Sequence, residues 1–185
     1  MAKINNNLIT EGFTGMLGKQ VVFKKRLGTR YAAAPPTINE NSKPTAAQQL
    51  NRDKHARSTD YAKGAIKDPD IKAMYQAVAI GGQSAYNVAW LDARHAPKVS
   101  AIVTNAYKGN TGDIIFVEAS DNFKVTAVKV SIYAGDALIE EGNAIVTPGN
   151  LLWVYTATVA NASASKIVAT AFDLANNEGV MEVFL

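Results

Sequence analysis

The sequence predicts an α+β protein in three parts: an extended arm, a small helical segment and an all-β sandwich. Residues 1–41 are rich in glycine and contain a Pro-Pro pair, whereas residues 42–97 contain several helix-start signals. Residues 98–185 alternate short apolar runs with turn residues, which is typical of strands. Charge divides at the same boundary: residues 1–97 hold 14 Lys and Arg against 7 Asp and Glu, and residues 98–185 hold 5 against 9.

The arm, residues 1–41, is expected to contain a β-hairpin. The apolar segments 20–25 and 29–34 flank Leu27-Gly28, and Pro35-Pro36 ends the second segment because proline cannot donate to a strand ladder. An isolated two-stranded hairpin is only marginally stable in water. We therefore expect partners to brace the arm.

Glycine and basic side chains are the predicted docking contacts of the arm. The glycines allow positive φ and close backbone approach. The basic residues lie in a stretch, residues 12–39, that contains no acid, and so suit an acidic surface. Docking on a protein partner is favoured over two alternatives, a solvated hairpin and nucleic-acid binding by phosphate neutralisation. The predicted docking residues are Gly12, Gly15, Gly18, Lys24, Lys25, Arg26 and Arg30.

Residues 42–97 are predicted to form a helical platform. Pro44 and a Thr45-x-x-Gln48 capping box start a first helix, and Asp68-Pro69 starts a second. Gly81-Gly82 separates a third helix, which Ser84 caps and which ends near His95. Because these helices are thinly apolar, we expect them to pack against the β-domain or neighbouring subunits. The expected apolar positions are Ala46, Leu50, Ala56 and Tyr61 in the first helix and Tyr86, Trp90 and Leu91 in the third.

Residues 98–185 are predicted to form an immunoglobulin-like sandwich. About seven short strands separated by Gly, Asn, Asp and Pro turns are typical of that architecture. In the segment 151–159, Trp153, Tyr155 and Ala157 are expected to share one face of a strand. The predicted strands are 98–104, 112–120, 124–133, 137–142, 151–159, 166–173 and 179–185.

Three motifs in this part resemble those of bacterial and phage immunoglobulin-like modules. They are Ala119-Ser120-Asp121-Asn122, Trp153-x-Tyr155-x-Ala157 and Ala171-x-Asp173-x-x-Asn176-Asn177. The segments 15–36 and 43–66 resemble N-terminal segments of proteins from Bacteroidetes and their tailed phages. The resemblance implies a virion component, such as a capsid auxiliary protein or a head or tail accessory protein, and it implies no catalytic residue.

Residue chemistry predicts no enzyme, cofactor or metal site. Cysteine is absent, which excludes thiolate nucleophiles and cysteine-ligated zinc. His55 and His95 lack metal-ligand spacing, and the adjacent Glu140 and Glu141 face opposite sides of a strand. Loop carboxylates can bind Ca²⁺, but turn formation is the favoured role because the acids are isolated. The loop acids in question are Asp113, Asp121, Asp136 and Asp173.

The favoured function is therefore a non-enzymatic structural protein of a virion, made in the host cytoplasm. Its expected partners are other virion proteins or further copies of itself, without a membrane, since no apolar run approaches the roughly 20 residues of a membrane span. One alternative is a module that binds a glycan or a cell surface, for which Tyr107 and Phe123 are the loop aromatics. A second alternative is nucleic-acid binding by the basic arm.

Overall fold

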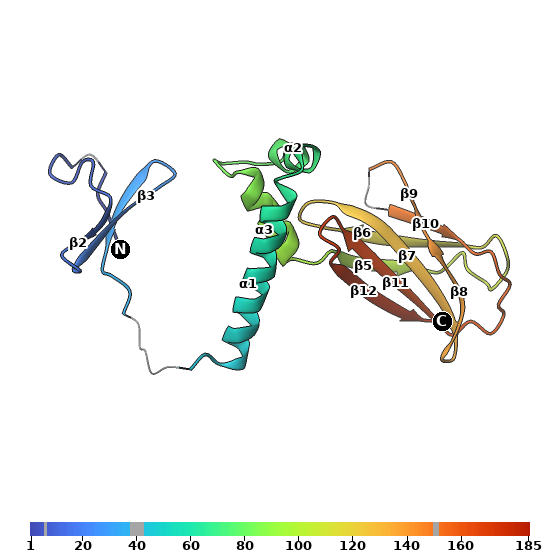
Figure 1. Ribbon diagram of the computed structural model, residues 1–185. Helices are drawn as coiled ribbons and strands as arrows, with labels where there is room; N and C mark the ends of the chain where they lie inside the picture. Colours follow the sequence, from blue (N-terminus) through green and yellow to red (C-terminus); the bar gives the residue numbers. More distant parts are fainter. Residues whose placement is uncertain (6, 38–42, 150–151) are drawn as a thin grey trace. The chain divides into compact units, whose positions relative to one another are not determined.

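The computed structural model describes residues 1–5, 7–37, 43–149 and 152–185, which divide into two compact units, Met1–Gln48 and Gln49–Leu185. The described residues form three helices and three antiparallel sheets of four strands each (Figure 1). This confirms the predicted α+β class with a sandwich. Three predicted features lie partly outside the described residues: the end of the arm, residue 42 of the helical segment and residue 151 of a strand.

In the first unit, four short strands form one antiparallel sheet in the order β1-β4-β3-β2. They are β1 (Ala2–Lys3), β2 (Gly15–Leu17), β3 (Val21–Arg26) and β4 (Thr29–Ala33). The predicted hairpin is present, because β3 pairs with β4 across Leu27 and Gly28. Both turn residues have positive φ, 48° and 79°, as in the type I′ turns that match the twist of a two-residue hairpin.

This sheet has no hydrophobic core of its own among the described residues of the first unit, since none of them is fully buried. Several large apolar side chains are instead exposed, among them Leu8, Leu17 and Leu27. Apolar burial is the main favourable contribution to folding, so this unit gains little from its own packing.

Three helices follow, and each begins at a predicted capping residue. They are α1 (Ala46–Ala65), α2 (Pro69–Ala77) and α3 (Ala85–Arg94). Thr45 and Gln48 form the predicted capping box, because the side-chain oxygen of each accepts the backbone N–H of the other, at 2.9 and 3.2 Å. The side chains of Asp68 and Ser84 accept backbone N–H bonds at the starts of α2 and α3.

The remaining strands form two sheets with the orders β5-β6-β10-β9 and β12-β11-β7-β8. All seven predicted strands are present, and the two-residue β9 is an additional one. The strands are β5 (Lys98–Val103), β6 (Ile114–Ser120), β7 (Val125–Ala134), β8 (Ala137–Asn143), β9 (Ile145–Val146), β10 (Leu152–Thr156), β11 (Lys166–Asp173) and β12 (Glu178–Phe184).

The two sheets share one hydrophobic core, to which alternate residues of the strands contribute. The prediction that Trp153, Tyr155 and Ala157 share one face is confirmed, because all three are buried. Burial of each large side chain contributes about 1.5–3 kcal/mol. The buried positions of β6 and β11 are Ile115, Val117, Ala119, Ile167, Ala169, Ala171 and Asp173.

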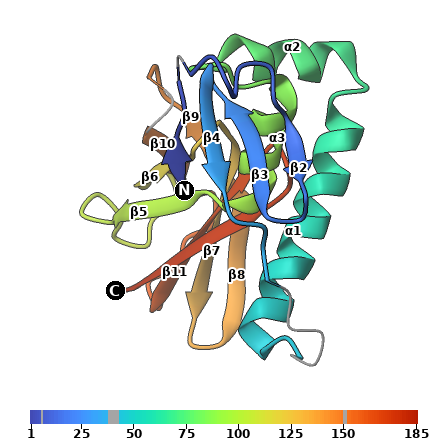
Figure 2. The same cartoon turned by 90° about the vertical axis from the view of Figure 1, so that its left-hand side faces the viewer.

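A second, smaller core joins the helices to one end of the sandwich (Figure 1). Phe123, between β6 and β7, and Leu174, between β11 and β12, pack against it. The predicted packing of the helices on the β-domain is thus confirmed. Within the helical group, α2 lies at the C-terminal end of α1 (Figure 2). The buried residues of this core are Ala62, Ala65, Tyr75, Ala85, Val88 and Ala89.

The apolar face predicted for the first helix is wrong at Ala46, Leu50 and Ala56, which are exposed, and holds only for Tyr61, which packs against the second core. Leu50 is 54% exposed, and burial begins only at Ser58, where α1 reaches the other helices. In α3 the aromatic side chains Tyr86 and Trp90 lie at the edge of the core, and smaller residues occupy its centre. Alanine permits close approach between elements. The spacing of the larger apolar residues therefore did not predict which residues of these helices are buried.

Candidate functional site

The predicted basic docking residues lie on both faces of the β3–β4 hairpin. Lys24, Lys25 and Arg26 are exposed, and Arg30 is half-buried. Lys25 is paired directly with Arg30 across the hairpin, while side chains on either side of Lys25 point to the opposite face. Lys25 and Arg30 therefore lie on one face of the hairpin, and Lys24 and Arg26 lie on the opposite face.

A hollow of about 330 Å³ lies beside the Lys25–Arg30 pair. The Asn5 side chain lines this hollow and accepts the backbone N–H of Arg30 at 2.8 Å. The Glu11 carboxylate lies 4.0 Å from the Arg30 guanidinium, but it is exposed and offsets only part of the positive charge. The hollow thus keeps a surplus of cationic side chains.

The three predicted docking glycines have positive φ, at 86° for Gly12, 94° for Gly15 and 57° for Gly18. Within the chain, open space surrounds the position of a side chain at each of them, so close backbone approach there stays a prediction about a partner. An apolar hollow of about 300 Å³ lies beside Gly15. The exposed side chains of Phe13 and Met16 line this hollow.

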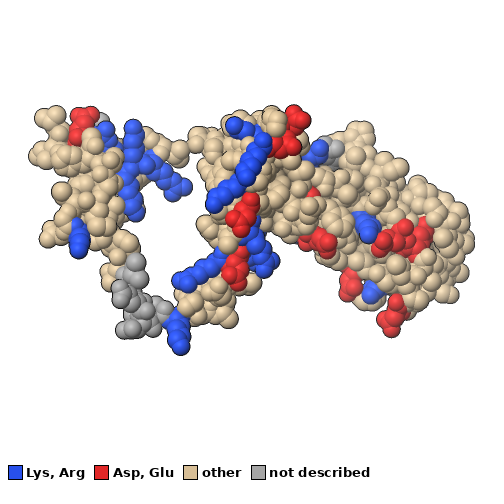
Figure 3. Space-filling view, viewed as in Figure 1, with Lys and Arg blue, Asp and Glu red and all other residues tan. Residues whose placement is uncertain are grey.

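The first three turns of α1 are exposed on every side: no residue from Ala46 to Arg57 is even half-buried. Lys and Arg side chains lie along this helix (Figure 3). Lys54 and Arg57, together with Arg94 of α3, line a hollow of about 360 Å³. Arg94 is held there by a hydrogen bond to Asn51 at 3.1 Å and lies over the ring of Trp90.

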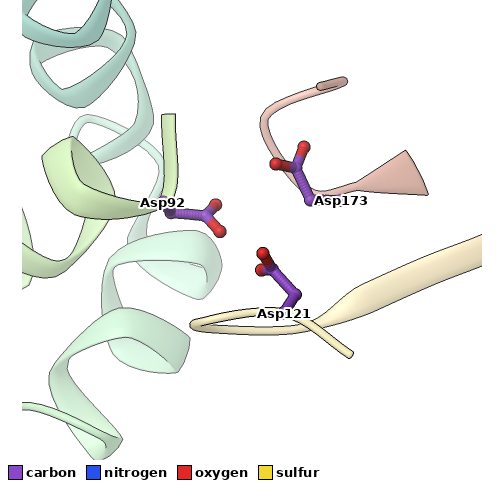
Figure 4. A group of neighbouring side chains, drawn as sticks. All are labelled: Asp92, Asp121 and Asp173. Carbon is purple, nitrogen blue, oxygen red and sulfur yellow. The ribbon is translucent and has the colours of Figure 1, made fainter. Parts of the chain in front are cut away.

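Three carboxylates meet where the helices contact the sandwich. Asp92 comes from α3, Asp121 from the turn between β6 and β7, and Asp173 from the end of β11. One oxygen of each lies within 4.8 Å of the others, and the three side chains point toward one another (Figure 4). We call this group the acid cluster.

Hydrogen bonds hold the Asp92 side chain of the acid cluster in place from the helical side. Tyr75, which is fully buried, donates its hydroxyl to Asp92 Oδ2 at 2.5 Å. The Tyr75 oxygen lies 2.8 Å from the Tyr61 hydroxyl, which in turn contacts the Leu174 carbonyl oxygen at 3.2 Å. Desolvation and the bond to Asp92 raise the pKa of Tyr75, so it stays a hydrogen-bond donor.

The two sandwich acids are fixed by turn hydrogen bonds. Asp121 Oδ2 accepts the backbone N–H groups of Phe123 and Lys124 at 3.0 and 3.1 Å. Asp173 accepts both the backbone and side-chain N–H groups of Asn177 at 2.7 Å. The Asn177 amide also donates to the Asp92 carbonyl oxygen at 3.2 Å, which ties α3 to the β11–β12 turn.

Burial and the charges of neighbouring acids raise the pKa of Asp92 and of Asp173. Burial, together with the charges of Asp173 and Asp121, raises the pKa of Asp92 to about 7, against the lowering effect of the Tyr75 hydrogen bond. Burial also raises the pKa of Asp173, although the Asn177 hydrogen bonds lower it. The cluster offers oxygen atoms alone, the ligand type preferred by hard cations such as Ca²⁺.

The predicted turn role is confirmed for three of the four loop acids. Asp121 and Asp173 cap their turns as described, and Asp113 Oδ2 accepts the N–H groups of Lys108 and Asn110 at 2.6 and 2.8 Å. Asp136 is exposed in the β7–β8 turn. The prediction of a turn role did not include the meeting of Asp121 and Asp173 in the acid cluster.

The histidines lie where the sequence placed them. His55 packs edge-on against Trp90, and His95 forms the C-cap of α3, with Nδ1 3.0 Å from the Leu91 carbonyl oxygen. The loop aromatics Tyr107 and Phe123 are largely buried, so they lend no support to the glycan-binding alternative. Tyr107 is 6% exposed in the sandwich core, and Phe123 packs on Tyr75.

Sequence reasoning missed Asp92, the one member of the acid cluster that lies on a helix. A usable signal was present, because Asp92 follows Val88 by four residues and Ala89 by three, which puts an acid on the buried face of α3. An acid in such a position requires a partner.

No family model matches the chain, and no curated protein does. Among solved structures, an engineered protein has 20% identity and a TM-score of 0.34, and the matched region covers 48% of this chain and 18% of that one. A hypothetical protein from Pyrococcus horikoshii OT3 has 14% identity and a TM-score of 0.29, covering 49% and 88%. These likenesses are too slight to assign a function. Among the described residues, no helix has both the length and the apolarity to cross a bilayer.

Proposed function

We propose that the chain is a non-enzymatic structural protein of a phage virion, either a capsid auxiliary protein or a head or tail accessory protein. In this proposal the first unit and the exposed turns of α1 dock on neighbours, and the sandwich is presented as an immunoglobulin-like domain. The observation that carries the docking role is the coreless sheet of the first unit, in which no described residue is fully buried. Such a sheet needs a covering surface to bury apolar area.

The strand order supports the immunoglobulin-like assignment. One sheet has the order β5-β6-β10-β9 and the other β12-β11-β7-β8. If β5, β6 and β7 are lettered A, B and C, and β9 to β12 are lettered D to G, the first sheet has the order A-B-E-D. The second sheet has the order G-F-C, with β8 added at its edge next to C. This is the arrangement of immunoglobulin domains. The virion assignment depends on the resemblance of the sequence motifs.

Charge supports another copy of the chain as the docking partner. Residues 1–97 carry a surplus of cations and residues 98–185 a surplus of anions, so the arm of one copy matches the sandwich of the next. The division of the cations between two faces of the hairpin supports protein docking over a continuous track for phosphates.

Sedimentation velocity of the full chain tests this proposal. We expect self-association that weakens with salt and is lost on the double substitution Lys24→Glu with Arg26→Glu. Lys63→Glu with Lys72→Glu makes the same change of charge at exposed sites outside the docking surface and serves as the control. A wild-type monomer whose first-unit amides are protected from hydrogen exchange would show that the arm needs no partner.

Two further measurements separate the remaining alternatives. Salt-sensitive DNA binding that requires Lys24 and Arg26 would favour the nucleic-acid alternative. Mass spectrometry of purified phage particles tests the virion assignment directly, since a structural component must be present in the particles.

A further inference from the structure

The acid cluster places three carboxylates in an environment that is unfavourable for their charges. Asp92 and Asp173 have exposed fractions of 0% and 1%, so water screens them poorly. All three belong to elements that are distant in the sequence, so local turn formation does not account for their meeting. Like charges brought together in a buried place require a compensating positive charge or a proton.

Two oxygens of the acid cluster are without a hydrogen-bond donor. Asp92 Oδ1 and Asp121 Oδ1 are both buried, and within the described parts of the chain neither contacts a donor. The second oxygen of each is already satisfied, by Tyr75 and by two backbone N–H groups respectively. The unsatisfied oxygens thus belong to side chains that their neighbours hold fixed, and Asp92 points into the cluster (Figure 4).

We propose that the acid cluster binds one Ca²⁺ ion, with Asp92, Asp121 and Asp173 as its protein ligands. Oxygens bound to one Ca²⁺ lie about 2.3–2.6 Å from it, so two ligands on opposite sides are separated by up to about 5 Å. The 4.8 Å limit on the separations in the cluster is compatible with this geometry. Mg²⁺ fits less well, because it keeps several waters and the site is buried.

The surrounding hydrogen bonds have the form of an outer shell around a metal site. Tyr75 orients Asp92, and Asn177 orients Asp173 through both of its N–H groups. Such partners fix the ligands in the geometry that the ion requires. A bound ion would fasten α3 to both sandwich turns and so stabilise the contact between the helices and the sandwich. This inference is independent of the docking proposal.

Binding to the full chain at pH 7.5 tests the assignment, with terbium luminescence as a direct readout because Tyr75 adjoins the site. After removal of metals with a chelator, we expect one Ca²⁺ per chain by calorimetry and displacement of terbium by Ca²⁺. Thermal unfolding should shift upward, since an ion at 100 times its dissociation constant increases the ratio of folded to unfolded chain about 100-fold.

Asp121→Asn is the informative variant, since its side-chain oxygen can still accept the turn N–H groups. We expect it to fold and to lose the calcium response, whereas Asp136→Asn, in an exposed turn, should keep it. The proposal is overturned if Ca²⁺ changes neither terbium emission nor the unfolding temperature of the wild type. It is equally overturned if Asp121→Asn responds as the wild type does, because the ion then binds without the Asp121 carboxylate.

Discussion

Glu140 provides the sharpest test of how the sandwich is held together. This residue of β8 is 7% exposed, and its carboxylate accepts four hydrogen bonds. Oε1 accepts the Tyr155 hydroxyl at 2.8 Å and both the backbone N–H and the hydroxyl of Thr158, at 2.5 and 2.8 Å. Oε2 accepts the Val159 N–H at 3.3 Å. The substitution Glu140→Gln removes the charge with little change in shape.

The expected cost follows from these contacts. A hydrogen bond to a charged group contributes about 1.5–3 kcal/mol, against about 0.5–1.5 kcal/mol for a neutral one. Glutamine keeps the oxygen that accepts three bonds but places an NH₂ group opposite the Val159 N–H. We expect the free energy of unfolding at pH 7 to fall by about 2–4 kcal/mol, allowing for non-additivity among bonds that share one carboxylate.

The effect should depend on pH. Burial acts to raise the pKa of Glu140, but the hydrogen bonds from Thr158, Tyr155 and Val159 together hold it below its usual value. A lowered pKa means that the unfolded chain binds the proton more tightly. The stabilisation is therefore complete above the unfolded pKa of about 4.3 and is lost as pH falls through the folded value.

Urea unfolding at pH 7 and between pH 3 and pH 5, followed by tryptophan fluorescence, measures both effects. Glu141→Gln is the control, because Glu141 is exposed on the opposite face and pairs with Lys129 at 3.0 Å. An exposed pair contributes only about 0.2–1 kcal/mol. Equal losses for the two variants, or a loss for Glu140→Gln that persists unchanged at pH 3, would refute the reasoning.

Three further substitutions test local features of the chain. Gly179→Ala should lower the unfolding temperature sharply, because the added Cβ would overlap the Pro97 carbonyl oxygen and force the backbone to shift; circular dichroism melting measures this. Gly64→Ala, in the open on α1, should instead stabilise the protein by about 0.5–1 kcal/mol in the same assay. Leu27→Asn should slow hydrogen exchange of the β3–β4 amides, because leucine at φ 48° is strained and asparagine tolerates that region; unchanged exchange would contradict the strain.

The sequence was most informative where structure depends on near neighbours. Thr45, Asp68 and Ser84 form the expected caps because a cap needs only a side chain and the N–H groups two or three residues later. The apolar alternation of β10 likewise depends on strand geometry alone. These features follow from rules that do not require knowledge of the fold.

Prediction failed where burial depends on distant partners. Leu50 was expected to be inside, but among the described residues of α1 burial begins only at Ser58, two turns further on. Among the described residues, the Asp92 side chain has no hydrogen-bond partner on its own helix. The two acids that it meets lie in turns of the sandwich about 30 and 80 residues further on. Convergence of this kind is a property of the tertiary structure.

Pro97 marks a change of charge, but the packing continues across it. Tyr61 contacts the Leu174 carbonyl oxygen, and the Asp92 carbonyl oxygen accepts a hydrogen bond from Asn177. Gly179 leaves room for the Pro97 backbone, so the chain at the charge boundary is packed against β12. The helices and the sandwich therefore share interior contacts, and the docking proposal requires an external surface only for the first unit and the exposed turns of α1. Charge reversal at Lys24 and Arg26 should accordingly impair assembly without lowering the stability of the sandwich.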